Sequence, residues 1–330
     1  MQKSSDQRVI ELGRQLFSDP RLSADGKVSC SRCHVPRLAF SDGRPLALGR
    51  DDVIETRNTP SLLNAVYLDA LFWDGRRASL ESQALAPLTN PAEHAFRSQS
   101  ELVAVIRRSP SYLRAFQGAF RVSAAGIDAK LVTRALAAYE RTLLAGDSAF
   151  DRYLYGHDSG ALSPAAVRGL SLFRGRAGCS SCHAIGSSYA LLTDGQYHVS
   201  PMGLSEGVTK SLGQLTREIS ESTKAGNHRK IEHLIATDPN VAALGRFVVT
   251  LNPRDIGTFR TPSLRNVSLT APYMHDGSIA TLSQAVDEEL YRRGRVLKYP
   301  IPLTVNERHD LVAFLDSLTS PSALGSPATK

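Results

Sequence analysis

The sequence is poor in several residue types that carry chemistry or span membranes. Its 330 residues include four cysteines, three methionines and one tryptophan. It has no run of the roughly 18–20 apolar residues that a membrane-spanning helix needs, and residues 1–12 lack the apolar segment of a secretory signal peptide. No basic run with interleaved aromatic residues occurs, so no nucleic-acid partner is expected.

Histidine is absent between His34 and His94, so this stretch offers no imidazole to a metal ion. The other histidines, His94 among them, are expected at the surface rather than as ligands. The 42% of apolar residues is sufficient for two modest hydrophobic cores. A formal charge of +7 is compatible with a weakly basic surface that faces an acidic protein partner.

All four cysteines lie in two Cys-x-x-Cys-His motifs, which leaves none for disulfides. The spacing suits haem c, in which two thiols add to the vinyl groups and the adjacent histidine binds the iron. A zinc site or a dithiol redox pair is the alternative, and the immediate histidine and the second copy argue against it. We therefore predict two covalent haem c groups, held by Cys30, Cys33, His34, Cys179, Cys182 and His183.

Haem c attachment in bacteria takes place outside the cytoplasm, so a periplasmic protein is expected. Met1 then marks an engineered start or a trimmed precursor, and the signal peptide is absent from this sequence. The haem propionates subtract up to about four charges, which brings the holoprotein closer to neutrality.

The two halves of the chain also resemble each other outside the motifs. Thr-Pro-Ser-Leu occurs at 59–62 and 261–264, and Asp-Gly follows at the same offset, which aligns Trp73 with His275. This pattern is typical of a duplicated unit. We predict a mainly α fold with long loops and little strand, made of two cytochrome c-like domains, 1–150 and 151–330.

Helical spacing and capping signals predict several elements of this fold. Residues 187–257 are an insertion that the first half lacks, and their weak periodicity predicts no element. The glycine-containing segment 145–162 is expected to be a linker. Helices are expected over 98–113 with an interruption at Pro110, and over 128–144, 164–173 and 304–318.

Together the motifs resemble the di-haem cytochrome c peroxidase superfamily and, within it, the MauG-like branch. The segments that carry the resemblance are Asp19-Pro20-Arg21-Leu22-Ser23, Arg57-Asn58-Thr59-Pro60, Phe72-Trp73-Asp74-Gly75-Arg76, Thr261-Pro262-Ser263-Leu264-Arg265-Asn266 and Ala271-Pro272-Tyr273-Met274-His275-Asp276-Gly277. The resemblance implies that peroxide reacts at the N-terminal haem, that the C-terminal haem stores or relays electrons, and that Trp73 lies between them.

The resemblance also implies which iron is open. Ordinary family members carry a displaceable histidine about sixteen residues after the first motif, and Arg50 stands there instead. The first iron is therefore expected to be open, which favours the MauG-like branch. A carboxylate above the iron can move a proton between the peroxide oxygens. The family pattern assigns this work to Glu93 with Gln83, and Pro87 shapes the pocket.

The sixth ligand of the second iron, opposite His183, departs from the family pattern. Counting from Thr270 selects Glu289, whereas the local pattern Tyr-x-x-Gly selects Tyr291. Helical phase leaves both open, with Tyr291 favoured and Met274 and Met202 as minor alternatives. A phenolate would stabilise ferric iron, and a thioether would stabilise ferrous iron.

The family also binds one calcium ion between the haem groups through an asparagine side chain and backbone carbonyls. The matching residues are Asn58, Thr270 and Pro272. A lone asparagine is weak evidence by itself, because Ca²⁺ takes six to eight oxygen ligands. The same motifs place His275, Tyr273 and Arg265 around the second haem.

Three functions follow from these observations. The first is a MauG-like enzyme that uses hydrogen peroxide to form a high-valent di-haem state and oxidises residues, above all tryptophan, of a secreted partner protein. Ala177 replaces the surface tryptophan of the family's electron route, so Tyr189 or Tyr197 is expected to serve instead. The second is a cytochrome c peroxidase fed by a small donor cytochrome. The third, a pure electron-transfer protein, conflicts with the histidine-free stretch.

Overall fold

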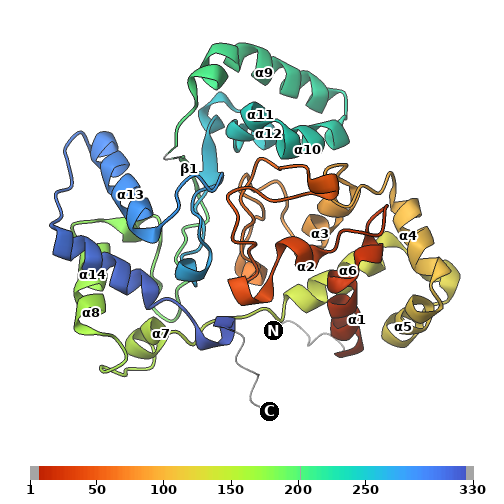
Figure 1. Ribbon diagram of the computed structural model, residues 1–330, viewed down its shortest axis with the longest axis horizontal. Coiled ribbons are helices and arrows are strands. Elements are labelled where there is room, and N and C mark those ends of the chain that lie inside the picture. The colour runs from red at the N-terminus through yellow and green to blue at the C-terminus, as the bar shows by residue number, and fades with distance from the viewer. Residues whose placement is uncertain (1–6, 201, 325–330) are drawn as a thin grey trace.

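The structure is a computed structural model that describes residues 7–200 and 202–324. It is mainly helical, with the two halves of the chain side by side and a third group of helices lying across one end (Figure 1). Over the described ranges, no helix combines the length and the apolar character that crossing a membrane requires.

The first half packs around a core that includes Leu16, Phe17 and Phe96. Its central contact is between α1 and α6, where Gly13 lies directly on the backbone of Ala135 with no room for a Cβ atom. The helices of this half are α1 (Gln7–Ser18), α2 (Cys30–Cys33), α3 (Leu80–Thr89), α4 (Gln99–Arg108), α5 (Pro110–Phe120) and α6 (Ala129–Glu140).

The second half repeats this contact with different residues. Its helices α8 and α14 cross where Gly169 meets the backbone of Asp310, again with no room for a Cβ atom. Phe150, Phe173 and Phe314 fill the core beside this crossing. The helices of this half are α7 (Ala149–Leu154), α8 (Pro164–Arg174), α13 (Leu282–Leu297) and α14 (Val305–Asp316).

Both halves also close in the same way after the Thr-Pro-Ser-Leu segment. Asn64 and Asn266 each adopt a left-handed backbone conformation. The side-chain amide of each bonds the backbone at the C-terminal end of its half. Asn64 donates to the Ala145 carbonyl at 2.7 Å, and Asn266 accepts from the Ser320 N–H at 2.8 Å. The repeat read from the sequence thus corresponds to shared local geometry. The proposed boundary at 150/151 stays a prediction.

The insertion that the sequence left unplaced is a helical layer with its own core. Val208, Leu215 and Ile219 line the buried face of α9, and they pack with Ile231 and Phe247. Val208, Leu212, Leu215 and Ile219 recur every three or four residues, a helical spacing that the reading of this segment as poorly periodic overlooked. The insertion contains β1 (Tyr197–Val199), α9 (Glu206–Lys224), α10 (His228–Thr237), α11 (Pro239–Ala243) and α12 (Phe247–Thr250), and β2 (Thr258–Arg260) follows it directly.

Strand content is small, as predicted: β1 and β2 pair antiparallel in one two-stranded ribbon. The expected linker 145–162 is more ordered than predicted, since it contains α7. A buried ion pair at 2.7 Å between Asp151 of α7 and Arg265 holds this helix against the second half.

The capping signals place helix starts correctly. Ser98 caps α4 by accepting from the Glu101 N–H, and Pro110 opens α5 as a separate helix. The reciprocal half of the expected capping box is not formed in α4, because Glu101 accepts from the Arg97 N–H instead. In α14 both halves of the box, Thr304 and Glu307, are present.

The glycine crossings generate a stability prediction. Gly169→Ala forces a methyl group against the Asp310 carbonyl of α14, and overpacking of this kind costs about 1–3 kcal/mol. We expect a lower melting temperature for the holoprotein, measured by circular dichroism. The matched control is Gly213→Ala on the exposed face of α9, where a Cβ atom meets nothing within 4 Å, and it should be neutral or stabilising by up to about 1 kcal/mol. Equal melting temperatures for the two variants would contradict the close crossing.

Candidate active site

The first Cys-x-x-Cys-His motif lies on the short helix α2 and forms one wall of a cavity. Residues from α3 and the following turn form the opposite wall, and residues of the insertion close one side. The cavity thus brings together Cys30, Cys33, His34, Trp73, Gln83, Pro87 and Glu93, all named from sequence.

Each motif histidine is oriented by the same kind of contact. Nδ1 of His34 lies 2.9 Å from the Phe40 carbonyl, and Nδ1 of His183 lies 2.9 Å from the Leu192 carbonyl. Burial lowers the pKa of both imidazoles, which keeps them neutral. A neutral imidazole whose Nδ1–H donates to a carbonyl presents Nε2 to a metal.

Two buried arginines test whether a haem fits the cavity. Nε and Nη1 of Arg57 and Nε of Arg260 are buried without a hydrogen-bond partner, and both side chains line the cavity. Unpaired buried cationic donors are costly unless an anionic group satisfies them. The carboxylates of haem propionates are such groups, so the cavity suits a haem attached at Cys30 and Cys33.

The distal wall is shaped by α3 and its turn. Gln83 and Pro87 are four residues apart and lie on one face of α3. Glu93 accepts a hydrogen bond at 2.7 Å from Nδ2 of Asn90. Burial raises the pKa of Glu93 to about 7; Glu232 adds to the rise, while Arg76 and Asn90 oppose it. Glu93 is thus poised to exchange a proton near neutral pH.

A buried ionic cluster supports this wall. Asp74 is fully buried, 3.0 Å from Nη1 of Arg76 and 3.7 Å from Nη2 of Arg57. Burial alone would raise the pKa of Asp74, but the two arginines hold it below its usual value. Nε of Arg76 also pairs with Glu232 of α10 at 2.9 Å. Sequence reasoning missed Glu232, because it reaches the site from 156 residues away.

Trp73 connects the cavity wall to the second half of the chain. Its indole N–H donates to the Asn58 carbonyl at 2.9 Å, and the Asn58 N–H donates to the His275 carbonyl at 2.8 Å. His275 stacks on Phe259 at 3.9 Å. Two hydrogen bonds of the Asn58 backbone therefore link Trp73 to His275, the two residues that the sequence repeat aligns.

Two further predicted residues, Asn58 and Arg265, have defined surroundings. The Asn58 amide donates to the Arg44 carbonyl at 2.8 Å, which leaves its oxygen available to a cation. Calcium at Asn58, Thr270 and Pro272 stays a prediction. The guanidinium of Arg265 bonds Asp151 and the Ala190 carbonyl, a geometry that favours tying α7 to the second half over the expected role at the cofactor.

The expected surface position of His94 is wrong. Its side chain is only 3% exposed and lies on the wall of the first cavity. Nδ1 of His94 lies 2.6 Å from the Leu22 carbonyl, and burial lowers its pKa to about 4. The fold encloses His94 because Glu93 beside it turns into the cavity.

The structure places Glu289 and Tyr291, the two candidates for the sixth ligand of the second iron, on different faces of α13. Arg293 of α13 donates to Ser181 of the second motif at 2.8 Å, and Glu289 lies one turn earlier on the same helix face. Burial raises the pKa of the Cys179 thiol to about 11; Arg293 opposes the rise, and Glu289 adds to it. Glu289 therefore faces the second motif.

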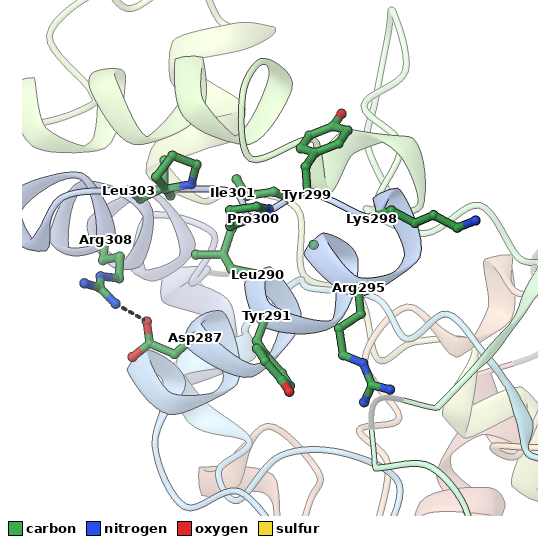
Figure 2. Close-up of a pocket in the computed structure, with 12 residues that line it drawn as sticks. Asp287, Leu290, Tyr291, Arg295, Lys298, Tyr299, Pro300, Ile301, Leu303 and Arg308 are labelled. Atoms are coloured by element: carbon green, nitrogen blue, oxygen red, sulfur yellow. Dashed lines mark hydrogen bonds and ion pairs between the residues drawn. The ribbon is translucent and has the colours of Figure 1, made fainter.

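Tyr291 lies on a different face of α13. Its side chain is 63% exposed and, with Arg295, Lys298 and Tyr299, lines a separate open cavity of about 530 Å³ (Figure 2). A shift of two residues turns a helical side chain by about 200°. In this geometry Glu289, and not the favoured Tyr291, shares the face of α13 from which Arg293 reaches the second motif.

Comparisons with known proteins agree with this site. The chain matches the family described as di-haem cytochrome c peroxidase over residues 7–159. It is 36% identical to the methylamine utilization protein MauG of Methylorubrum extorquens, over 96% of this chain and 80% of that protein. It is 35% identical to the cytochrome-c peroxidase IdrP1 of Pseudomonas sp. (strain SCT), over 96% and 82%.

A solved structure extends this result. The fold matches a MauG-like protein associated with microbial copper homeostasis with a TM-score of 0.75 and 31% identity, over 98% of this chain and 92% of that one. The protein therefore belongs to the di-haem cytochrome c peroxidase family. It is an oxidoreductase of the kind that acts with peroxide, and the family implies two haem cofactors.

Covalent attachment generates a prediction. Replacing Cys30 and Cys33 by Ala removes both thioether positions of the first motif and leaves the second intact. We expect the haem content, measured by pyridine haemochrome and intact mass, to fall from two covalent groups to one. Ser31→Ala, within the same motif, should retain two. Two covalent haem groups in the double variant would show that the first motif is not an attachment site.

Proposed function

We propose that the protein is a periplasmic MauG-like enzyme that uses hydrogen peroxide to oxidise residues, above all tryptophan, of a partner protein. The observation that carries the proposal is the distal wall of the first cavity. Glu93 there has a pKa of about 7, and Arg50, at the position of the displaceable histidine, lies outside the cavity and pairs with Asp51.

The chain's own residues prepare peroxide for cleavage. A haem bound at His34 would supply the iron that takes up peroxide and the two-electron redox chemistry. Glu93, in its ionised form, accepts the proton of the inner peroxide oxygen and returns one to the outer oxygen, which leaves as water. The amide of Gln83 orients peroxide by hydrogen bonding. The ring of Pro87 fixes its own backbone φ angle, which keeps this part of the cavity wall rigid.

Trp73 supports sharing of oxidising equivalents between the halves. Its ring lines the first cavity, and its hydrogen bond to Asn58 leads to His275 beside the second half. In our proposal Glu289 is the sixth ligand of the second iron. A carboxylate, like a phenolate, is an anionic oxygen ligand and stabilises the oxidised states of iron.

The exit route uses tyrosines in this proposal. Ala177 is fully buried, so its position gives no surface route. Tyr189 is 67% exposed, and Tyr291 and Tyr299 line the open cavity beside α13. Lys298 at this cavity has no ion-pair partner over the described ranges, which supports an acidic protein partner.

A second candidate is a cytochrome c peroxidase that reduces hydrogen peroxide with electrons from a small donor cytochrome. The observation that favours it is the position of Tyr291. In the MauG-like branch a tyrosine binds the second iron, but Tyr291 of α13 does not face the second motif. The relatives include both MauG proteins and cytochrome c peroxidases.

One equivalent of hydrogen peroxide added to the fully ferric protein separates the two candidates. We expect a rapid spectral change at both haem groups and a long-lived product, followed by stopped-flow absorption, because the first iron is open. An unreacted protein that responds only after one haem is reduced would establish the peroxidase alternative instead.

The second ligand generates its own prediction. Glu289→Met replaces an anionic oxygen by a thioether, and it should raise the reduction potential of the second haem by about 0.1 V or more within the roughly 0.8 V that axial ligands span. Tyr291→Phe, two residues along α13, should leave the potential unchanged in spectroelectrochemical titration. The reverse pattern, with Tyr291→Phe altering the potential and Glu289→Met silent, would restore Tyr291 as the ligand.

A further inference from the structure

Besides Glu93, the first cavity is lined by the carboxyl groups of Glu55 and Glu140, which the sequence motifs do not mark. Glu55 lies in the loop 47–57, where its N–H donates to the Ala47 carbonyl at 2.9 Å. Its side chain lines the same cavity as Glu93 and His34. The mechanism outlined above leaves this carboxyl without a role.

Gly49 holds the loop of Glu55 against the backbone beside Glu93. A Cβ atom at Gly49 would lie 2.9 Å from Oε1 of Glu55 and would strike the Ala92 carbonyl. The next residue, Arg50, donates its N–H to that same carbonyl at 2.7 Å. The loop is thus pinned to the residue that precedes Glu93, and the Glu55 carboxyl lies against this junction.

The surroundings of the two carboxyl groups are unequal. Glu93 accepts a hydrogen bond from Asn90, which favours its ionised form. Over residues 7–200 and 202–324, the carboxyl of Glu55 has neither a hydrogen bond nor an ion pair, so only the field of Arg76 favours a charge there. Burial and the nearby Glu93 raise the pKa of Glu55 well above its usual value; Asp42 adds to this, and Arg76 opposes it.

Arg76 cannot neutralise both groups. Its guanidinium already pairs with Asp74 and with Glu232, and Glu232 itself raises the pKa of Glu93. Two neighbouring carboxyl groups with one shared cation resist double ionisation, so they retain one proton between them near neutral pH.

We propose that Glu55 is a second catalytic acid–base residue of the first cavity, which holds a proton while Glu93 is ionised. The inference rests on the proposed peroxide reaction at this cavity. It assigns the two halves of the proton transfer to two groups instead of one.

The step balances as follows. Glu93 accepts the proton of the inner peroxide oxygen, and Glu55 donates its proton to the outer oxygen. The O–O bond breaks with its electron pair on the outer oxygen, which leaves as water; the two electrons are those that bound haem groups would supply. The pair ends with the proton on Glu93 and its charge unchanged, and transfer of that proton back to Glu55 restores the starting state.

Glu55→Gln tests the proposal in the holoprotein, with Glu101→Gln on the exposed surface of α4 as the matched control. The wild-type rate of reaction with peroxide should be bell-shaped in pH, because only the singly protonated pair is competent. It should rise through about 7 as Glu93 ionises, then fall as Glu55 loses its proton. Glu55→Gln should lower the maximum about 100-fold and abolish the fall at high pH.

A second measurement is independent of peroxide. The infrared difference spectrum of ferric wild type minus Glu55→Gln at pH 7 should contain the carbonyl band of a protonated carboxyl, shifted in D₂O. Absence of this band would show that Glu55 is ionised and would overturn the proposal. An unreactive wild type that retains the band would instead refute the proposed function while leaving the proton assignment standing.

Discussion

The buried carboxylate of Asp74 is the interaction on which the site depends. It pairs with Arg76 and Arg57 at the first cavity. Through Arg76 it also fixes Glu232 of α10. The Asp74 carbonyl also accepts from Arg246, just before α12, at 2.9 Å. An uncompensated buried charge is strongly destabilising, so loss of this carboxylate would release two cations and loosen the insertion from the first half.

The same cluster sets the electrostatics of the cavity. Arg76 pairs with Asp74 and Glu232. It therefore offsets the rise in the pKa values of Glu55 and Glu93 only in part. The ion pairs that hold this cluster together thus leave the pKa values of the two distal carboxyl groups raised, which is what their proposed proton exchange requires. This links the packing of the insertion to the chemistry of the first half.

The two haem motifs share a scaffold but differ in what faces them. At Gly13 and Gly169 a helix of each half lies directly on the backbone of its neighbour, and each motif histidine is oriented by a backbone carbonyl. The first motif shares its cavity with Gln83 and Glu93, whereas α13 presents Glu289 and Arg293 to the second. One scaffold therefore gives the two motif histidines different surroundings.

The sequence by itself determined the features that depend on short spacing. The Cys-x-x-Cys-His motifs and the helix starts at Ser98 and Thr304 all follow from local backbone geometry. The tertiary structure decided what depends on distant segments. It placed Glu55 and Glu232 beside Glu93, enclosed His94, gave the insertion a core of its own, and turned Glu289 rather than Tyr291 toward the second motif. The physical reason is that burial and charge pairing depend on neighbours in space, which residue spacing along one helix cannot specify.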